Sequence, residues 1–430
     1  MIDTPRGLKG IRVIRVIRVI AFACIAATVA CGGRAPVGTG PYADKVAEDV
    51  PLIEHALGVK FKRPPKIEVR SREQVREFLL AKVKTPEAQK ELANEETIFK
   101  LLGMIPDTMH LANFYVRVLT EQIIGYYDPS TKILYVVDGA PEEYVGITIM
   151  HELVHALPDQ YVNLDSLEHI TGDDDRAAAA QAVVEGEATY EQVYITVGGA
   201  GNIAAQLPGG WESMRQSIRD AQATQPIFAS APMVIQETLL FPYINGADFV
   251  RRFKEHVKNR LPLDSLPIST EQVMHDSAYF TPQRDVPSEI VLPPIAGTVD
   301  RNDFGEFGTR LFLFQHTKDR EQSIRASNGW DGDRYALVKT PGGHALVWVS
   351  VWDTPTDAAE FMSAIDAVMK MRFNVTPTVH GERRHYDAGT RTIETDVREV
   401  GGRPVVLYVD VPAGESTALV DFAKVKVTPR

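Results

Sequence analysis

A segment that is apolar on nearly every side contains two histidines and a glutamate, and this combination limits how the chain can fold. Residues 141–158 read PEEYVGITIMHELVHALP, and a proline followed by two glutamates is typical of a helix start. A helix that is apolar all round is expected to be buried. An unpaired buried carboxylate is costly, and Glu152 has no Lys or Arg within one helical turn. We therefore expect a metal ion and a water-filled cleft at this helix.

A metal ion would resolve that cost. Residues four apart on a helix are offset by only about 40°, so His151 and His155 project from one face within reach of a single ion. Glu152 lies about 100° from His151, beside the ligands, where a base can deprotonate a water. The alternative is a pair of core histidines bonded to backbone carbonyls, which leaves Glu152 unexplained.

A catalytic zinc site needs a third protein ligand and one open position for water. We favour Glu185, which lies 30 residues after His155 on the next expected helix. The adjacent Gly186 removes a side chain where two helices have to approach closely. Glu187 is about 200° further round the helix and is expected to face solvent or support the site. The other candidates are Asp159, Asp165, His169, Asp173, Asp174 and Asp175.

The pattern of apolar residues predicts an α+β fold. A strand is expected at 65–71 and a hairpin at 123–138, with its turn at Asp128–Thr131. The stretch at 231–257 reads as partly helical. Helices are expected at 43–58, 72–83, 96–104, 110–122, 141–158 and 176–197.

A proline-rich segment at 283–297 is the expected boundary between two domains. The first domain, residues 43–285, holds the histidines and is expected to be mainly helical with a small sheet. The second, residues 298–430, reads as a smaller α+β domain.

The first thirty residues differ from the rest of the chain. Five basic residues precede the uncharged run VIAFACIAATVA, which has the length of a signal-peptide apolar region. The run ends at Cys31, so residues 1–30 are expected to be a lipoprotein signal peptide, with 31–42 as a flexible tether. An ordinary secretory signal or an uncleaved anchor is the alternative. Removing these residues changes the net charge from −11 to −15, which argues against nucleic acid as a partner.

Two motifs resemble a known family. HELVH followed by VVEGEAT is similar to the gluzincin zinc metallopeptidases, and more closely to bacterial peptidase MA-like lipoproteins. The resemblance covers about residues 45–200 and implies a zincin-like fold, with His151, His155 and Glu185 as zinc ligands and Glu152 as base. It also implies that an extended peptide pairs with the outer strand of the hairpin.

The sequence departs from this family at one supporting position. Many gluzincins have Asp four residues after the ligand glutamate, where this chain has Thr189. The group that stabilises the oxyanion is not assigned, and its candidates are Tyr190, Tyr194 and His275.

The expected function is that of a zinc-dependent peptidase, exported and held on a membrane by an N-terminal lipid. Its expected partners are a peptide or protein substrate and the membrane. One alternative is a metal-dependent hydrolase of another exported bond, such as a cell-wall amide. A second is a catalytically inactive binding or assembly lipoprotein, against which the intact Glu152 argues.

The lipid attachment can be tested directly. If Cys31 is acylated, the protein partitions into detergent and becomes labelled by a fatty-acid analogue, and Cys31→Ser abolishes both. Equal labelling of the variant would exclude Cys31 as the acylated residue.

Overall fold

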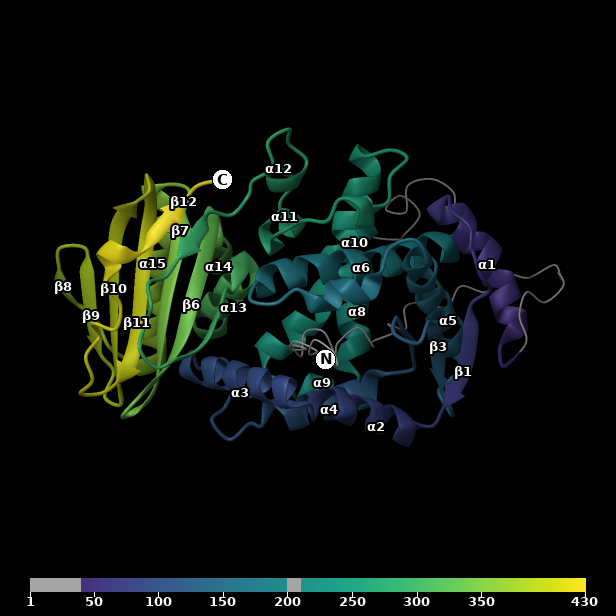
Figure 1. The fold of residues 1–430 in the computed structure, drawn as a ribbon, viewed down its shortest axis with the longest axis horizontal. Helices are drawn as coiled ribbons and strands as arrows, with labels where there is room; N and C mark the ends of the chain where they lie inside the picture. The colour runs from purple at the N-terminus through teal and green to yellow at the C-terminus, as the bar shows by residue number, and fades with distance from the viewer. Residues whose placement is uncertain (1–39, 199–209) are drawn as a thin grey trace, which may run out of the picture.

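The structure is a computed structural model that describes residues 40–198 and 210–430. The expected signal peptide, Cys31 and residues 31–39 of the expected tether lie outside the described residues. Helices and strands are mixed along the chain, which confirms the α+β class. A large sheet lies at one end and helices fill the centre, with α1 and a small sheet at the other end (Figure 1).

The small sheet has the strand order β1-β3-β2. Strand β1 (Lys66–Arg70) runs parallel to β3 (Ile133–Val137), and β2 (Gly125–Asp128) pairs with β3 as the expected hairpin. The turn between the hairpin strands is stabilised by Asp128, whose side chain accepts hydrogen bonds from the backbone and hydroxyl of Ser130. Because β2 comes last in the strand order, it forms one edge of this sheet.

Three long helices form the centre. Helix α5 (Glu142–Ala156) and helix α6 (Asp174–Thr196) match the two predicted helices, and Asp173 caps α6 by accepting from the N–H of Arg176. Helix α10 (Met233–His256) continues through Pro242 as one helix, although the sequence indicated only partial helix there.

Helices α6 and α10 touch backbone to backbone. A Cβ added at Gly186 would lie 2.2 Å from the carbonyl carbon of Gly246, and one added at Gly246 would lie 1.9 Å from the oxygen of Ala182. The close approach expected at Gly186 is confirmed, and the partner is α10. Only glycine fits at this crossing.

Further helices surround this centre. The helix α1 packs on α5, and α2 packs on α4. Their bounds and those of the remaining helices before residue 280 are α1 (Ala43–Leu57), α2 (Arg72–Val83), α3 (Pro86–Leu101), α4 (Leu111–Gln122), α8 (Gly210–Ala223), α9 (Pro226–Ala229), α11 (Thr270–Met274) and α12 (Asp276–Tyr279).

A seven-stranded antiparallel sheet, in the order β5-β6-β7-β11-β10-β9-β8, dominates the C-terminal region. The sheet face with Leu337, Trp348 and Tyr408 joins the main core, and the other face packs under a short pair of strands, β4 and β12. The elements are β4 (Glu289–Val291), β5 (Thr298–Asn302), α13 (Gly305–Thr317), α14 (Arg320–Ser327), β6 (Trp330–Thr340), β7 (Gly343–Trp352), α15 (Pro355–Phe373), β8 (Thr378–His380), β9 (Arg383–Asp387), β10 (Arg391–Val400), β11 (Arg403–Pro412) and β12 (Lys426–Thr428).

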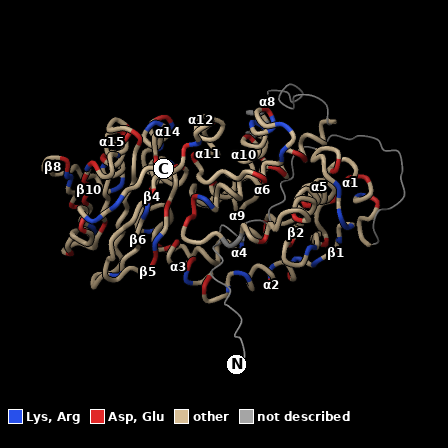
Figure 2. Tube along the Cα trace, turned by 45° about the horizontal axis from the view of Figure 1, so that its top comes forward, with Lys and Arg blue, Asp and Glu red and all other residues tan. Residues whose placement is uncertain are grey.

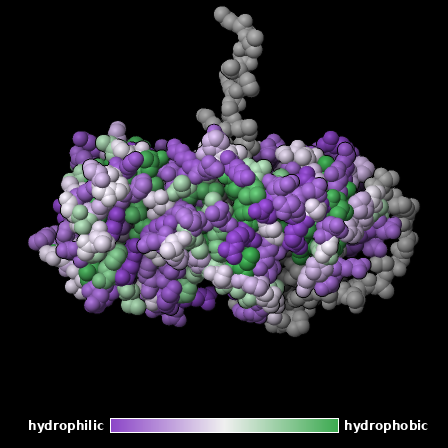
Figure 3. All heavy atoms as spheres, turned by 90° about the horizontal axis from the view of Figure 1, so that it is seen from below, coloured by the Kyte–Doolittle hydropathy of each residue, from purple (hydrophilic) through white to green (hydrophobic). Residues whose placement is uncertain are grey.

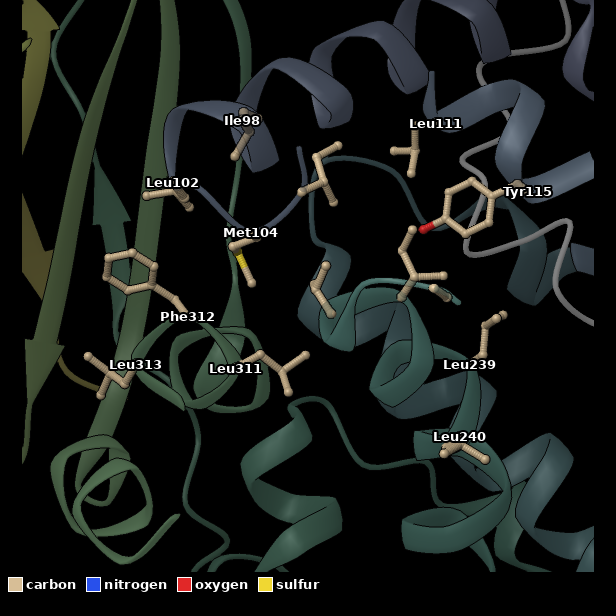
Figure 4. Packing of buried hydrophobic residues seen from close by; sticks show 14 of the residues in the cluster. Ile98, Leu102, Met104, Leu111, Tyr115, Leu239, Leu240, Leu311, Phe312 and Leu313 are labelled. Atoms are coloured by element: carbon tan, nitrogen blue, oxygen red, sulfur yellow. The ribbon is translucent and has the colours of Figure 1, made fainter. Parts of the chain in front are cut away.

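The C-terminal region is joined to the central helices by polar and apolar contacts. The side chains of Asn302 and Asp303 accept hydrogen bonds from the backbone N–H groups of Asp174 and Asp175, at 2.9 and 2.8 Å. These N–H groups belong to the first turn of α6 and have no partner within the helix. The main core also continues from the central helices into this region, as the packing of Met104 near α13 shows (Figure 4). The domain boundary near 283–297 remains a prediction.

The surface carries both signs of charge. Basic and acidic residues are interspersed along the described elements (Figure 2), and hydrophilic residues cover much of the face seen from below, with small hydrophobic areas between them (Figure 3). Among the described helices, none combines the length and apolar character needed to cross a bilayer.

The glycine crossing predicts a stability difference between two helical glycines. Gly246→Ala should lower the free energy of unfolding by about 3 kcal/mol, because its methyl group collides with backbone that cannot rotate away. The control is Gly146→Ala on α5, whose Cβ would meet only the flexible end of Lys45, at 3.3 Å. It should change stability by no more than ~1 kcal/mol, in the stabilising direction. Urea unfolding measures both, and equal effects would contradict the tight crossing.

Candidate metal centre

Helices α5 and α6 bring three predicted ligands together. His151 and His155 lie one turn apart on α5, and Glu185 lies opposite them on α6. The Oε2 atom of Glu185 is 3.4 Å from Nε2 of His151 and 3.3 Å from Nε2 of His155. All three are buried, and one potential ligand atom from each lies within 4.8 Å of the others. The group could hold a metal ion.

The charge of Glu185 favours a cation between these side chains. Burial disfavours its ionised form, but the imidazoles of His155 and His151 outweigh burial and lower the pKa of Glu185 to about 2. Its other oxygen, Oε1, is buried without a hydrogen-bond partner among the described residues. Burying a carboxylate oxygen without a hydrogen-bond partner lowers the stability of the folded protein, and a bound cation would offset that loss.

Gln192 orients His151. The side-chain oxygen of Gln192 lies 3.1 Å from Nδ1 of His151, so it can accept a hydrogen bond from the Nδ1–H tautomer and leave the lone pair of Nε2 available to an ion between His151 and Glu185. This residue was not predicted from the sequence. Gln192 lies seven residues after Glu185, which is two helical turns, so the same face of α6 was the available signal. The hydroxyl of Thr189 is buried without a hydrogen-bond partner among the described residues and makes no such contact.

Glu152 lies beside the ligands and is held by the edge strand. Its Oε2 accepts a hydrogen bond of 2.8 Å from the backbone N–H of Tyr127 in β2. Burial raises the pKa of Glu152, and the nearby imidazoles and this N–H offset the effect only partially. The hydroxyl of Tyr127 donates to Asp159, which also pairs with Lys132. Tyr127 is thus fixed at both its backbone and its side chain.

The other candidate ligands lie elsewhere. The carboxylate of Asp159 is occupied by Tyr127 and Lys132, and that of Asp175 accepts from Thr270. Glu187 is buried near Lys254 and Glu191, where burial raises its pKa to about 8. Glu187 therefore does not face solvent, which was one of the two roles expected for it. The side chain of His169 lies outside the described residues.

The three candidates for the oxyanion group are engaged in other contacts. The rings of Tyr190 and Tyr194 stack on each other, and His275 pairs with Glu306 of α13 at 2.8 Å. The ring near the site is that of Tyr243 on α10, whose centroid is 6.1 Å from that of His151. No local pattern indicated Tyr243, because it reaches the site only through the α6–α10 crossing.

Comparison with known proteins adds one match. Residues 291–420 match a domain of unknown function, DUF8575, which covers all seven strands of the C-terminal sheet and leaves the candidate metal centre outside. No curated protein and no solved structure matches the chain. The chemistry of the centre therefore rests on its own residues.

The geometry predicts which glutamate holds the metal. Glu185→Ala should lose most of the bound metal, because it removes the carboxylate that lies between both histidines. Glu187→Ala is the matched control on the same helix and should keep about one metal ion per chain. Metal analysis after dialysis gives the content of each variant, and the reverse pattern would move the third ligand to Glu187.

Proposed function

We propose that the protein is a zinc-dependent peptidase, with a zincin-like fold of the gluzincin type. The observation that carries this proposal is the position of Glu152, a buried carboxylate beside a His151–His155–Glu185 group and bonded to the edge strand of a sheet. Two imidazoles and one carboxylate are the protein ligands of several catalytic zinc sites. A purely structural zinc site would instead have four protein ligands.

A zinc ion bound by these three residues would act as a Lewis acid and lower the pKa of a water from 15.7 toward about 7. Glu185 supplies the negative charge, and its low pKa keeps it ionised throughout the neutral range. The contact of Gln192 with His151 keeps the Nε2 lone pair available as a ligand.

The edge strand supports a peptide as substrate. In the hairpin, the N–H of Val137 donates to the carbonyl of Ile124, so the backbone of Ile124 faces β3. Along an antiparallel strand, successive residues direct their backbone N–H and C=O groups alternately toward and away from the neighbouring strand. Tyr127, three residues after Ile124, therefore directs its backbone groups away from β3. The N–H of Tyr127 points to Glu152. An extended substrate that pairs with this edge would pass beside both Glu152 and the ligand group.

Glu152 acts as the general base in this proposal. It accepts a proton from the attacking water and later donates it to the leaving amine. Burial raises the pKa of Glu152, and a carboxylate with a raised pKa is a stronger base. The hydrogen bond from Tyr127 fixes the carboxylate, so that its orientation does not depend on substrate binding.

We also propose that the protein acts on the exported side of a membrane, anchored by a lipid on Cys31. The uncharged run that ends at this cysteine supports the proposal. The excess of acidic residues in the remaining chain leaves the lipid as the main attachment.

The mechanism predicts a loss of activity without a loss of metal. Glu152→Gln keeps the size of the side chain and removes the base, so cleavage of casein or a peptide library should fall by about 10²- to 10⁴-fold. Metal content should remain that of wild type. Equal cleavage by wild type and variant would exclude Glu152 as the base.

Two controls accompany this measurement. Glu187→Gln, a buried glutamate outside the ligand group, should keep activity close to that of wild type. Chelation should reduce the wild type at least as much as Glu152→Gln does, and the two treatments should not add, because base and metal act on the same water. Metal binding without cleavage of any peptide in the library would favour the inactive binding lipoprotein.

A further inference from the structure

A second candidate site lies between the central helices and the C-terminal region. A cavity of about 110 Å³ is bounded by α3, α6, α10, α13 and β6, and its lining does not include the residues of the metal centre. Two of its lining residues, Met104 and Leu311, are shown in Figure 4. Much of its wall is apolar, including Phe99, Met104, Val234, Phe241, Phe307 and Leu311.

A buried side-chain donor in this wall lacks a partner. Gln181 of α6 lines the cavity and is 4% exposed, and its Nε2 makes no hydrogen bond with any described residue. A donor buried in this way lowers the stability of the folded protein, because its hydrogen bonds to water are lost without replacement. A ligand with a carbonyl oxygen would supply the missing acceptor.

A backbone acceptor on α10 also lacks its usual partner. Within a helix, the carbonyl of residue 238 would accept from the N–H of residue 242, but Pro242 has no N–H. Thr238 and Pro242 both line the cavity, so this carbonyl belongs to the segment of α10 that borders it. A ligand with an N–H group would supply the missing donor.

The two groups lie on helices that run side by side in the same direction. Ala182 of α6 contacts Gly246 of α10, and further along both helices Glu191 pairs with Lys254. Gln181 comes directly before the first of these contacts, and the proline lies one helical turn before it on α10. The cavity therefore presents a donor from one helix and an acceptor from its neighbour.

The charges around the cavity favour an uncharged ligand. Among the described residues that line it, none is Lys, Arg or His, so an anion would be buried without a counter-charge. We assign none of the four carboxylates in the wall to a ligand, because each already takes part in an interaction within the protein: Glu91, Glu95, Asp174 and Asp300.

The volume limits the size of an occupant. An engineered cavity of about 150 Å³ with apolar walls binds benzene. A cavity of about 110 Å³ therefore suits a ligand no larger than benzene. Such a ligand has room for one short apolar group and one small polar group.

We propose that this cavity binds a small uncharged carboxamide, in which one short branched apolar group is joined to an amide. The apolar group packs in the cavity, the amide carbonyl accepts from Nε2 of Gln181, and the amide N–H donates to the carbonyl of Thr238. The proposal does not depend on the peptidase activity, and it gives the C-terminal region a role in forming the wall of a ligand site.

Isobutyramide is the probe for this site, because it joins a branched apolar group to an amide. An NMR titration of the full-length protein, followed by saturation transfer to the methyl groups of the ligand, should show binding with a Kd in the millimolar range or below. Isopropyl methyl ketone has the same size and acceptor but no N–H, and should bind about 5-fold more weakly. Isobutyrate, an anion, should bind more weakly still. No binding of isobutyramide, or equal binding of the ketone, would overturn the proposal.

A chelator separates this site from the metal centre. Because the cavity lining does not include the metal-centre residues, binding of isobutyramide should be unchanged after the metal is removed. Loss of binding together with the metal would place the ligand at the metal centre and overturn the proposal.

Two substitutions test the two hydrogen bonds separately. Gln181→Leu removes the donor and should weaken binding of isobutyramide about 10-fold. Pro242→Ala restores an N–H for the carbonyl of Thr238 within α10, so the amide should lose its advantage over the ketone. The matched control is Pro51→Ala, which restores an N–H inside α1, away from the cavity, and should leave the binding of both ligands unchanged.

A third substitution tests the cavity itself. Ala178→Phe fills the space and should abolish binding of both the amide and the ketone. If this variant does not fold, the other two decide the question. Unchanged binding of isobutyramide in both Gln181→Leu and Pro242→Ala would show that the ligand binds elsewhere and would overturn the proposal.

Discussion

The carboxylate of Glu185 lies buried between two imidazoles, and the surrounding architecture serves to hold it there. Its oxygen lies 3.3 and 3.4 Å from the two histidine nitrogens, while its second oxygen has no hydrogen-bond partner in the described chain. A carboxylate in this position is stable only with positive charge beside it. The helices α5 and α6 must therefore keep a fixed distance and rotation.

Helix α6 is also held by its close contact with α10. Gly186 lies next to Glu185, and its missing side chain lets α10 press its backbone against α6 at Gly246. The same crossing places Tyr243 next to His151. A small residue in one helix thus allows both the close packing of α6 on α10 and the position of the Tyr243 ring beside His151.

The sequence predicted the features of the site that depend on local spacing. The helix of His151 and His155, the hairpin before it and the helix of Glu185 all follow from periodicity over a few residues. Gln192 was missed although its spacing from Glu185 was visible, because a glutamine seven residues away had no expected role. Tyr127 and Tyr243 could not be predicted, since their contacts join segments 25 and 92 residues away from the residues that they meet. The uninterrupted α10 was also missed, because local rules treat Pro242 as a break.

The capping of α6 affects when, during synthesis of the chain, the helix that carries Glu185 can be completed. Asn302 and Asp303 accept from the first N–H groups of α6 across 128 residues of chain. A ribosome adds about 5 to 20 residues per second, so these acceptors are made roughly 6 to 26 s after the helix that they cap. During that interval the first turn of α6 has only water and its own Asp173 as acceptors. The helix that carries Glu185 is therefore finished only after the start of the C-terminal sheet has been synthesised.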